Sequence, residues 1–568
     1  MSAVGSSSAS ERLVELEREV ELEREDGVVS RGLFAPVVVV AFAVLAGGWL
    51  LQEGVDRSEN MYVRVRVLQE VVDHVETSFV DEVDRDGLFE SAIGGLIRDL
   101  GDPHSSFLPA EAYENLRIRT EGEYGGVGLE VVDRNDRVTV VSPIPNTPGQ
   151  RAGIRAGDQF FEIDGVRADT MVTDQAVELL RGRPGTEVTV RMLRPGVEDP
   201  IEFTVERARV RLQAVPFSLM LEPGIGYVPL ETVRETSSRE IRAAVDSLRD
   251  QGLAGLVLDL RGNPGGLLDE GIAVSDLFLD AGLAIVETRG RGPNQSEIYP
   301  ASSPDRYPGL PIVVLVDHAS ASASEIIAGA LQDHDRAVVV GETSYGKGSV
   351  QSLFRLTGGD VLRLTTARWY TPVGRSIHRE PDPDAESEVL EVAISGQLIT
   401  PTSLDGRPEF ESLGGRTLYG GGGITPDLFV SPEALSSPEG VAVYNLFTLG
   451  GRFATSLFDY AVSYVREHPG LQPGFELSDA ELEAFFGTLP DAPVGRARDV
   501  FVGARRYVRY RLEREIALQV GGDAGQFEQS RKHDRQLAVA VELLRSAANP
   551  VDLIEQLEAK ESELSSGS

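Results

Sequence analysis

Residues 311–351 read PIVVLVDHASASASEIIAGALQDHDRAVVVGETSYGKGSVQ, with strand, turn and helix patterns in close succession. The apolar run Ile312–Val316 is typical of a strand buried on both faces. A turn of alternating Ala and Ser follows, and from Glu325 onward the apolar residues recur at helical spacing. A second apolar run, 337–340, leads into a glycine-rich loop with a single lysine, Lys347. This order predicts an α/β fold whose turn exposes a serine hydroxyl beside the free amides of a helix N-terminus.

A serine hydroxyl is a poor nucleophile until a base takes its proton. The candidate bases are His318, His334, the distant His378 and Lys347. For a lysine to act near neutral pH, its pKa must fall about 3 units from a value near 10.4, which requires desolvation. The spacing alone leaves two interpretations open: a serine–lysine dyad, or a small-residue packing turn with a surface lysine.

The phrases SASASEIIAGALQD and GETSYGKGSVQ resemble the signature of the carboxy-terminal processing peptidases, also called tail-specific proteases. The resemblance extends over residues 60–430 and implies a serine endopeptidase that needs no metal or organic cofactor. It implies that Ser322 is the nucleophile and that Lys347, 25 residues later, is the general base. It also implies that Gln351 holds the lysine in place and that Glu325 supports the site.

A phosphate-binding motif overlaps the same loop, because residues 341–347 read G-x-x-x-x-G-K. That motif requires Ser or Thr at the next position, where Gly348 stands, and it must open a helix. Residues 350–356 and 361–366 instead have the pattern of a β-hairpin. The sequence therefore argues against an NTPase.

A further buried strand, residues 256–261, ends in two charges and is followed by the phrase GNPGG. Ligands gather at such strand ends in α/β sheets. The phrase matches the D-L-R-x-N-P-G-G of the same family, which implies that Asp259 and Arg261 support the site; a structural ion pair is the alternative interpretation. The family also implies an oxyanion hole formed by the Ala323 amide together with an amide of Gly265 or Gly266.

Residues 125–207 resemble a PDZ domain, above all in the phrases AGIRAGD at 152–158 and IDG at 163–165. Successive free N–H groups in a glycine loop can bind a terminal carboxylate while the peptide adds a strand beside the groove. The resemblance assigns this function to Gly126, Val127, Gly128 and Leu129. The expected partners are therefore protein or peptide substrates bound through their C-termini.

The composition argues against a nucleic-acid partner and excludes cysteine chemistry. A net charge of −36 over 568 residues weighs against a nucleic-acid partner. The absence of cysteine excludes disulfides, thiolate metal sites and a cysteine nucleophile, and it is compatible with a bacterial periplasm.

The N-terminal residues predict a membrane anchor. Residues 33–51 are uninterrupted by charge, and 19 helical residues span about 28 Å, close to a hydrocarbon core of about 30 Å. We expect an uncleaved signal anchor rather than a cleaved signal peptide, because a long charged tail precedes a segment that exceeds the usual length of a signal-peptide core. Arg31 favours a cytoplasmic tail, although Arg57 weakens that argument. The predicted location is the bacterial inner membrane, single-pass, with the protease on the periplasmic or extracytoplasmic side.

The predicted fold is an α/β protease core with an inserted PDZ domain, an N-terminal transmembrane helix and a mainly helical C-terminal region. The predicted segments are a charged tail 1–32, an anchor 33–51, a helical segment 60–107, a PDZ domain 125–207, the core 208–430 and the helical region 431–568. The helical segment ends in D-P-H-S-S-F, where His104 is expected to be a turn residue, and residues 376–420 are expected to be a surface insert. A catalytically idle PDZ scaffold and a carrier of small apolar ligands are the rival functions, and a homo-oligomer remains open.

Overall fold

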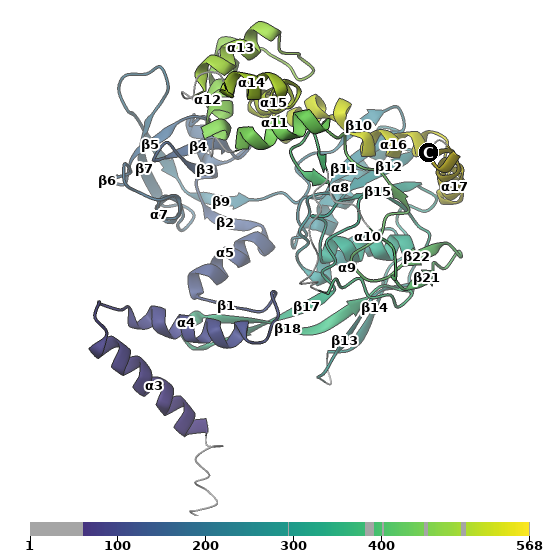
Figure 1. Cartoon of the computed structure of the whole chain (residues 1–568), viewed down its shortest axis with the longest axis horizontal. Helices are drawn as coiled ribbons and strands as arrows, with labels where there is room; N and C mark the ends of the chain where they lie inside the picture. The colour runs from purple at the N-terminus through teal and green to yellow at the C-terminus, as the bar shows by residue number, and fades with distance from the viewer. Residues whose placement is uncertain are drawn as a thin grey trace, which may run out of the picture. The chain divides into compact units, whose positions relative to one another are not determined.

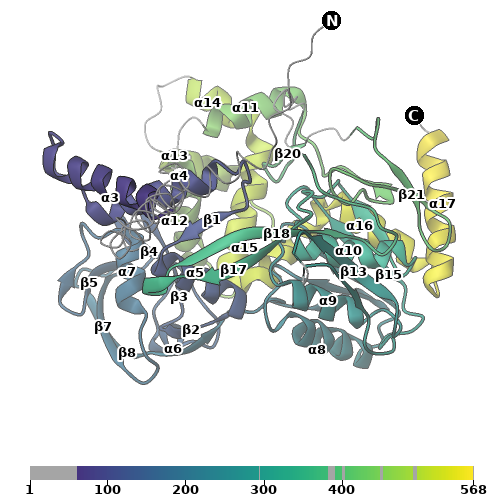
Figure 2. The same cartoon turned by 90° about the horizontal axis from the view of Figure 1, so that it is seen from below.

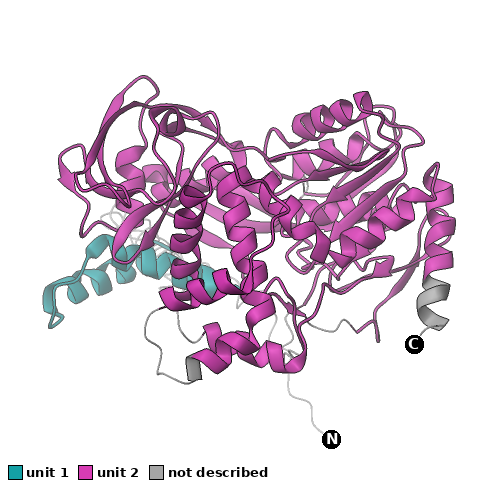
Figure 3. Ribbon diagram, turned by 90° about the horizontal axis from the view of Figure 1, so that it is seen from above, with its two compact units in different colours: residues 1–100 teal, residues 101–568 magenta. Residues whose placement is uncertain are grey.

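The computed structural model describes residues 61–292, 295–380, 391–399, 403–447, 452–489 and 496–566. It divides into two compact units, residues 1–100 and 101–568 (Figure 3). The first unit contains helices α3 (Met61–Ser78) and α4 (Arg85–Arg98), which lie within the predicted helical segment 60–107. The predicted anchor, 33–51, lies outside the described residues, and none of the helices described is both long and apolar enough to cross a bilayer.

The second unit contains a six-stranded sheet in the order β10-β11-β12-β15-β16-β23, parallel except for β10. Every residue of β11, β12, β15 and β16 is buried, as the continuous apolar runs predict for strands covered on both faces. The bounds are Leu219–Glu222, Ile225–Pro229, Gly255–Asp259, Ile312–Val316, Val338–Gly341 and Leu428–Phe429.

Helices cover both faces of this sheet. One apolar cluster joins it to α8 (Ser237–Asp250), α9 (Leu268–Asp276) and α10 (Ala323–Asp333). The cluster on the other face contains residues of α16 (Arg535–Arg545) and α17 (Pro550–Ser566), and α17 stands at the outer edge of that layer (Figure 2). The predicted core boundary at residue 430 is therefore too early, because the last two helices of the chain complete the protease core.

A second sheet carries the expected hairpin, with β17 and β18 paired antiparallel. Its order is β1-β18-β13-β14, with β17 on β18. Because β17 starts only two residues after Lys347, a strand follows the lysine, and a phosphate-binding loop opening a helix is excluded. The bounds are β1 Ser106–Leu108, β13 Ala284–Gly290, β14 Glu297–Pro300, β17 Ser349–Arg355 and β18 Val361–Tyr370, with a short 3-10 turn η1 (Thr357–Gly359) in the hairpin.

The PDZ-like part has its own sheet, β3-β4-β5-β7-β8, and its own apolar core. A two-stranded ribbon, β2 with β9, connects it to the protease core, and α5 (Ala110–Glu121) precedes it. The bounds are β2 Glu123–Gly126, β3 Leu129–Arg134, β4 Arg137–Pro143, α6 Pro148–Ala152, β5 Gln159–Ile163, β6 Val166–Arg167, α7 Thr173–Leu180, β7 Glu187–Leu193, β8 Ile201–Glu206 and β9 Ala208–Arg211.

Five further helices form a separate apolar cluster that confirms the mainly helical C-terminal region (Figure 1). One of them, α12, also contacts the PDZ-like part. The Arg134 guanidinium lies 4.1 Å from the centre of the Phe458 ring, and Arg466 Nη1 donates to Pro195 O at 3.0 Å. The helices are α11 Ser437–Phe447, α12 Arg452–Glu467, α13 Asp479–Thr488, α14 Arg496–Gly503 and α15 Arg505–Ser530, followed by η2 Arg531–His533.

The insert expected on the surface at 376–420 is partly built into the core. Ile394 is 3% exposed and belongs to the apolar cluster of the C-terminal helices. Arg416 forms ion pairs with Asp335 and Asp427 at 2.5 and 2.8 Å. The short strands here are β19 Glu391–Val392, β20 Leu398–Ile399, β21 Glu409–Glu411 and β22 Thr417–Tyr419.

Candidate active site

Ser322 occupies the sharp turn between β15 and α10, directly before the first helical residue. Its φ of 56° lies in the region that residues other than glycine rarely adopt, and such a conformation costs about 1–3 kcal/mol. A neighbouring contact holds it, because Ser322 N donates to Glu325 Oε2 at 2.7 Å. The predicted nucleophile therefore stands at the N-terminus of a buried helix.

Glu325 is fully buried and joins the serine turn to the lysine loop. Its Oε2 accepts from Ser322 N and from Lys347 N at 2.9 Å, and its Oε1 accepts from Ser344 Oγ at 2.5 Å and Gly346 N at 2.7 Å. Burial raises the pKa of this carboxyl, and the four hydrogen bonds oppose that shift. This carboxylate sets the relative positions of the two backbone segments that carry the predicted dyad.

Lys347 is partly buried, and its pKa is shifted in the direction that a general base requires. Burial lowers the pKa of the ammonium, and the positive charge of Arg363 lowers it further, whereas Glu325 and Asp102 act in the opposite sense. The indole of Trp369 anchors the loop, because its Nε1 donates to Lys347 O at 3.0 Å.

The dyad hydrogen bond itself is not formed in this structure. Within the described residues, neither Ser322 Oγ nor Lys347 Nζ has a hydrogen-bond partner. Gln351, predicted to hold the lysine, donates instead from Nε2 to Ser349 Oγ at 2.9 Å and to Thr365 Oγ1 at 3.3 Å. The catalytic functions of Ser322, Lys347 and Gln351 therefore stay predictions.

Of the rival bases, His378 lies beside the lysine loop: a Cβ at Gly348 would lie 2.9 Å from His378 Cβ, and His378 Nδ1 is buried without a hydrogen-bond partner among the described residues. His334 closes the end of α10, and its Nε2 lies 2.7 Å from Ala284 O. His318 acts electrostatically on Glu342. Across the part of the chain that the structure describes, no histidine hydrogen-bonds to Ser322.

Two backbone amides are free to meet a developing oxyanion, one next to Ser322 and one in the GNPGG loop, which packs against Ser322 through Gly265. Ala323 N and Gly266 N have no hydrogen-bond partner among the described residues. The amide of Gly265 is occupied, because it donates to Asn263 Oδ1 at 2.8 Å. Gly265 also packs so closely that a Cβ there would lie 2.8 Å from Ser322 Cβ. Of the two glycines considered, Gly266 has the amide that is available.

A turn near the N-terminal end of the second unit also lies in the electrostatic environment of Lys347. Ser105 Oγ donates to Asp102 Oδ2 at 2.5 Å and accepts from Thr365 N at 3.0 Å, which ties this turn to β18. Burial lowers the pKa of His104, and the charge of Lys347 lowers it further. His104 is in a turn, as expected, but its proximity to the lysine was not predicted; the D-P-H-S-S-F phrase was the only signal.

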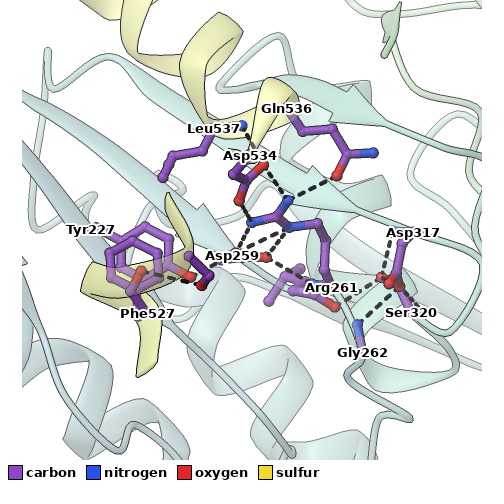
Figure 4. A network of polar contacts seen from close by, with 12 residues as sticks. Tyr227, Asp259, Arg261, Gly262, Asp317, Ser320, Phe527, Asp534, Gln536 and Leu537 are labelled. Atoms are coloured by element: carbon purple, nitrogen blue, oxygen red, sulfur yellow. Dashed lines mark hydrogen bonds and ion pairs between the residues drawn. The ribbon is translucent and has the colours of Figure 1, made fainter. Parts of the chain in front are cut away.

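Asp259 and Arg261 form the ion pair considered above, at 2.6 Å between Arg261 Nη2 and Asp259 Oδ2. Tyr227 Oη donates to Asp259 Oδ2 at 2.7 Å. Figure 4 shows the pair together with Asp534, a residue of the C-terminal helical region.

The predicted carboxylate-binding loop of the PDZ-like part has free donors. Val127 N and Gly128 N have no hydrogen-bond partner among the described residues. Gly128 has a φ of 75°, and a Cβ there would lie 2.3 Å from Thr147 Cβ, so only glycine fits at this position. Thr147 Oγ1 donates to Gly128 O at 3.0 Å and fixes the turn.

Comparison with known proteins agrees with this geometry. The model of peptidase family S41 matches residues 224–387, that of the PDZ domain matches 139–194, and that of the activating protease CtpB N-terminal domain matches 50–112. The carboxy-terminal-processing protease of Bartonella bacilliformis is 42% identical over 326 residues, which are 57% of this chain and 74% of that protein. The chain belongs to the carboxy-terminal-processing proteases. It is therefore a serine peptidase with a PDZ domain.

Two further relatives support the assignment of this protease. The carboxy-terminal processing protease CtpA of Bacillus subtilis is 33% identical over 57% of this chain and 69% of its own length. A carboxyl-terminal-processing protease of Synechocystis sp. is 35% identical over 57% of this chain and 77% of its own length. The solved photosystem II D1 C-terminal processing protease is 31% identical over 58% of this chain and 95% of that one, with a TM-score of 0.31.

Proposed function

We propose that the protease cleaves protein substrates near their C-termini with Ser322 as nucleophile and Lys347 as general base. The observation that carries the proposal is that the backbone amides of Ser322 and Lys347 both donate to Glu325 Oε2. This shared carboxylate holds the two residues in one place. In the reaction, neutral Lys347 takes the proton of Ser322 Oγ as that oxygen attacks the peptide carbonyl, and then gives it to the leaving amine. Water, activated by the same lysine, hydrolyses the acyl-enzyme.

The amides of Ala323 and Gly266 would stabilise the oxyanion of the tetrahedral intermediate. They are suited to this function because they are free and adjoin the serine turn. Because Lys347 Nζ has no partner within the described residues, its side chain can rotate toward Ser322 Oγ, and Gln351 at the start of β17 would hold the rotated lysine.

The PDZ domain would bind the free C-terminus of the substrate through the amides of Val127, Gly128 and Leu129. The apolar last residues of the substrate would lie along β3 as an added strand. We further propose that residues 33–51 anchor the protease in the bacterial inner membrane, with its catalytic part on the periplasmic side; the support is the length and apolar character of that segment.

The dyad is tested with single and double variants of the full-length protease on an unstructured protein substrate. Ser322→Ala and Lys347→Ala should each abolish cleavage, and the double variant should lose no more, because the two groups act as a unit. His318→Ala and His334→Ala should retain most of the activity. A dead histidine variant together with an active Lys347→Ala would overturn the assignment. Deletion of residues 33–51 followed by membrane fractionation tests the anchor separately.

A further inference from the structure

Arg261 is held from two sides by groups that are far apart in the sequence (Figure 4). On one side is Asp259, two residues earlier on β12. On the other is Asp534, which accepts from Arg261 Nη1 at 2.9 Å and from Nη2 at 2.7 Å. Gln536 Oε1 accepts from Arg261 Nη1 at 2.8 Å. All the guanidinium nitrogens are therefore bonded, and half of this coordination comes from the C-terminal helical region.

Asp534 is itself fixed. It is the N-cap of α16, and its Oδ1 accepts from Leu537 N at 3.0 Å. Gln536 is anchored by a bond from its Nε2 to Val430 O at 2.7 Å. Arg261 is 19% exposed and Asp534 20%, so the charge-assisted bonds between them are largely shielded from water. Burial opposes the ionised form of Asp534, but Arg261 keeps the pKa of this carboxyl below its ordinary value.

The loop that follows Arg261 leads directly to the proposed oxyanion hole. Gly262 N donates to Asp317 Oδ1 at 2.9 Å, and Asn263 Nδ2 donates to Leu230 O at 2.7 Å. Asn263 O accepts from Ala321 N at 2.9 Å, one residue before the nucleophile. Four residues separate Arg261 from Gly266, and this short loop is hydrogen-bonded at Gly262, Asn263 and Gly265.

We propose that Asp534 is a positioning residue for catalysis: by orienting Arg261, it sets the loop that presents the Gly266 amide to the reacting carbonyl. This inference rests on the proposed function of Ser322 and on the proposed oxyanion hole. Asp534 lies beyond residues 224–387, to which the S41 family model is matched. The C-terminal helical region thereby contributes to the active site without touching the substrate.

The test uses Asp534→Asn in the full-length protease, because asparagine caps helices as well as aspartate but does not pair with a guanidinium as a carboxylate does. The matched control is Glu222→Gln. Glu222 also forms a bidentate ion pair between the core sheet and α16, with Arg545 at 2.8 and 2.6 Å, but at an exposed position away from the loop. Kinetics are measured at a temperature where circular dichroism finds every variant folded, with Ser322→Ala as the inactive reference.

We expect kcat of Asp534→Asn to fall at least about tenfold, with KM changed less than threefold, since complete loss of an oxyanion donor costs about 100- to 1000-fold in kcat. Glu222→Gln should retain the wild-type kcat, and Asp534→Glu, which restores the carboxylate, should recover part of the loss. An unchanged kcat in Asp534→Asn, or an equal loss in Glu222→Gln, would overturn the inference. Wild-type activity in Ser322→Ala would instead overturn the proposed function, so the two failures are distinguishable.

Discussion

The backbone amides of Ser322 and Lys347 donate to the same oxygen, Oε2 of Glu325. The two groups predicted to exchange a proton are thus held through their main chains, while Ser322 Oγ and Lys347 Nζ have no hydrogen-bond partner among the described residues. A buried carboxylate suits this purpose because it accepts several N–H bonds and has no donor of its own when ionised.

Replacing Glu325 should damage both stability and activity. Glu325→Ala leaves four donors without their acceptor, and one buried unsatisfied donor costs about 1–3 kcal/mol. We therefore expect the free energy of unfolding to fall by at least about 2 kcal/mol and cleavage to be lost even in the folded fraction. Thermal and denaturant unfolding with a peptidase assay measure both. Glu342→Gln, in the lysine loop, is the control and should be tolerated. A fully active Glu325→Ala would contradict the inference that this carboxylate holds the serine turn and the lysine loop together.

The pH dependence should follow the environment of Lys347. Only the neutral amine accepts a proton, so kcat/KM should rise with pH and level off above the lowered pKa of Lys347. Arg363 lowers this pKa and Asp102 raises it. Arg363→Gln should therefore move the midpoint to higher pH, and Asp102→Asn should move it to lower pH. Shifts in the same direction, or a midpoint unchanged in both variants, would mean that another group is the base.

The lowered pKa of Lys347 also predicts that its charged form destabilises the folded protein. The unfolded chain binds the Lys347 proton more tightly than the folded chain does, so stability rises with pH between the lowered pKa and the ordinary value of 10.5. Below that window the buried charge opposes folding. Lys347→Met should therefore raise the Tm at neutral pH while abolishing cleavage, and this gain should shrink as the pH rises from the lowered pKa to 10.5. A Tm that falls at neutral pH would mean that the ammonium stabilises the fold.

Recognition of the substrate's tail should depend on its terminal charge. Charge-assisted hydrogen bonds contribute about 1.5–3 kcal/mol each, so amidating the C-terminus should weaken binding at least about tenfold, or 1.4 kcal/mol. Cleavage of one substrate with a free and with an amidated tail measures this preference. Gly128→Ala should reduce it, because a Cβ would lie 2.3 Å from Thr147 Cβ. Equal rates for both tails in the unmodified protease would mean that the PDZ domain does not bind C-termini.

The sequence predicted strand boundaries best where both faces of the strand are buried. The bounds predicted for β15 coincide with those observed, because a parallel strand covered on both faces requires an unbroken apolar run. The turn at Ser322 and the hairpin after Lys347 were likewise predictable from local patterns.

Contacts between residues that are far apart in the chain leave no comparable local pattern in the sequence. Asp534 lies 273 residues from Arg261, and an N-capping aspartate has the same local sequence signal whether or not a distant arginine pairs with it. The amphipathic pattern of α16 does not specify which surface it covers, so its place on the protease sheet could not be predicted. Whether the Gly265 amide is free or bonded depends on the orientation of the Asn263 side chain. The sequence alone does not determine that orientation.

The bond from the Trp369 indole to Lys347 O gives the protease an intrinsic optical reporter. The chain has two tryptophans, and the other, Trp49, falls in the predicted anchor. In a version that begins after the anchor, all tryptophan fluorescence would come from Trp369, which is 1% exposed. Loss of its hydrogen bond or entry of water would change the emission wavelength, so stopped-flow fluorescence could time movements of the lysine loop separately from bond cleavage.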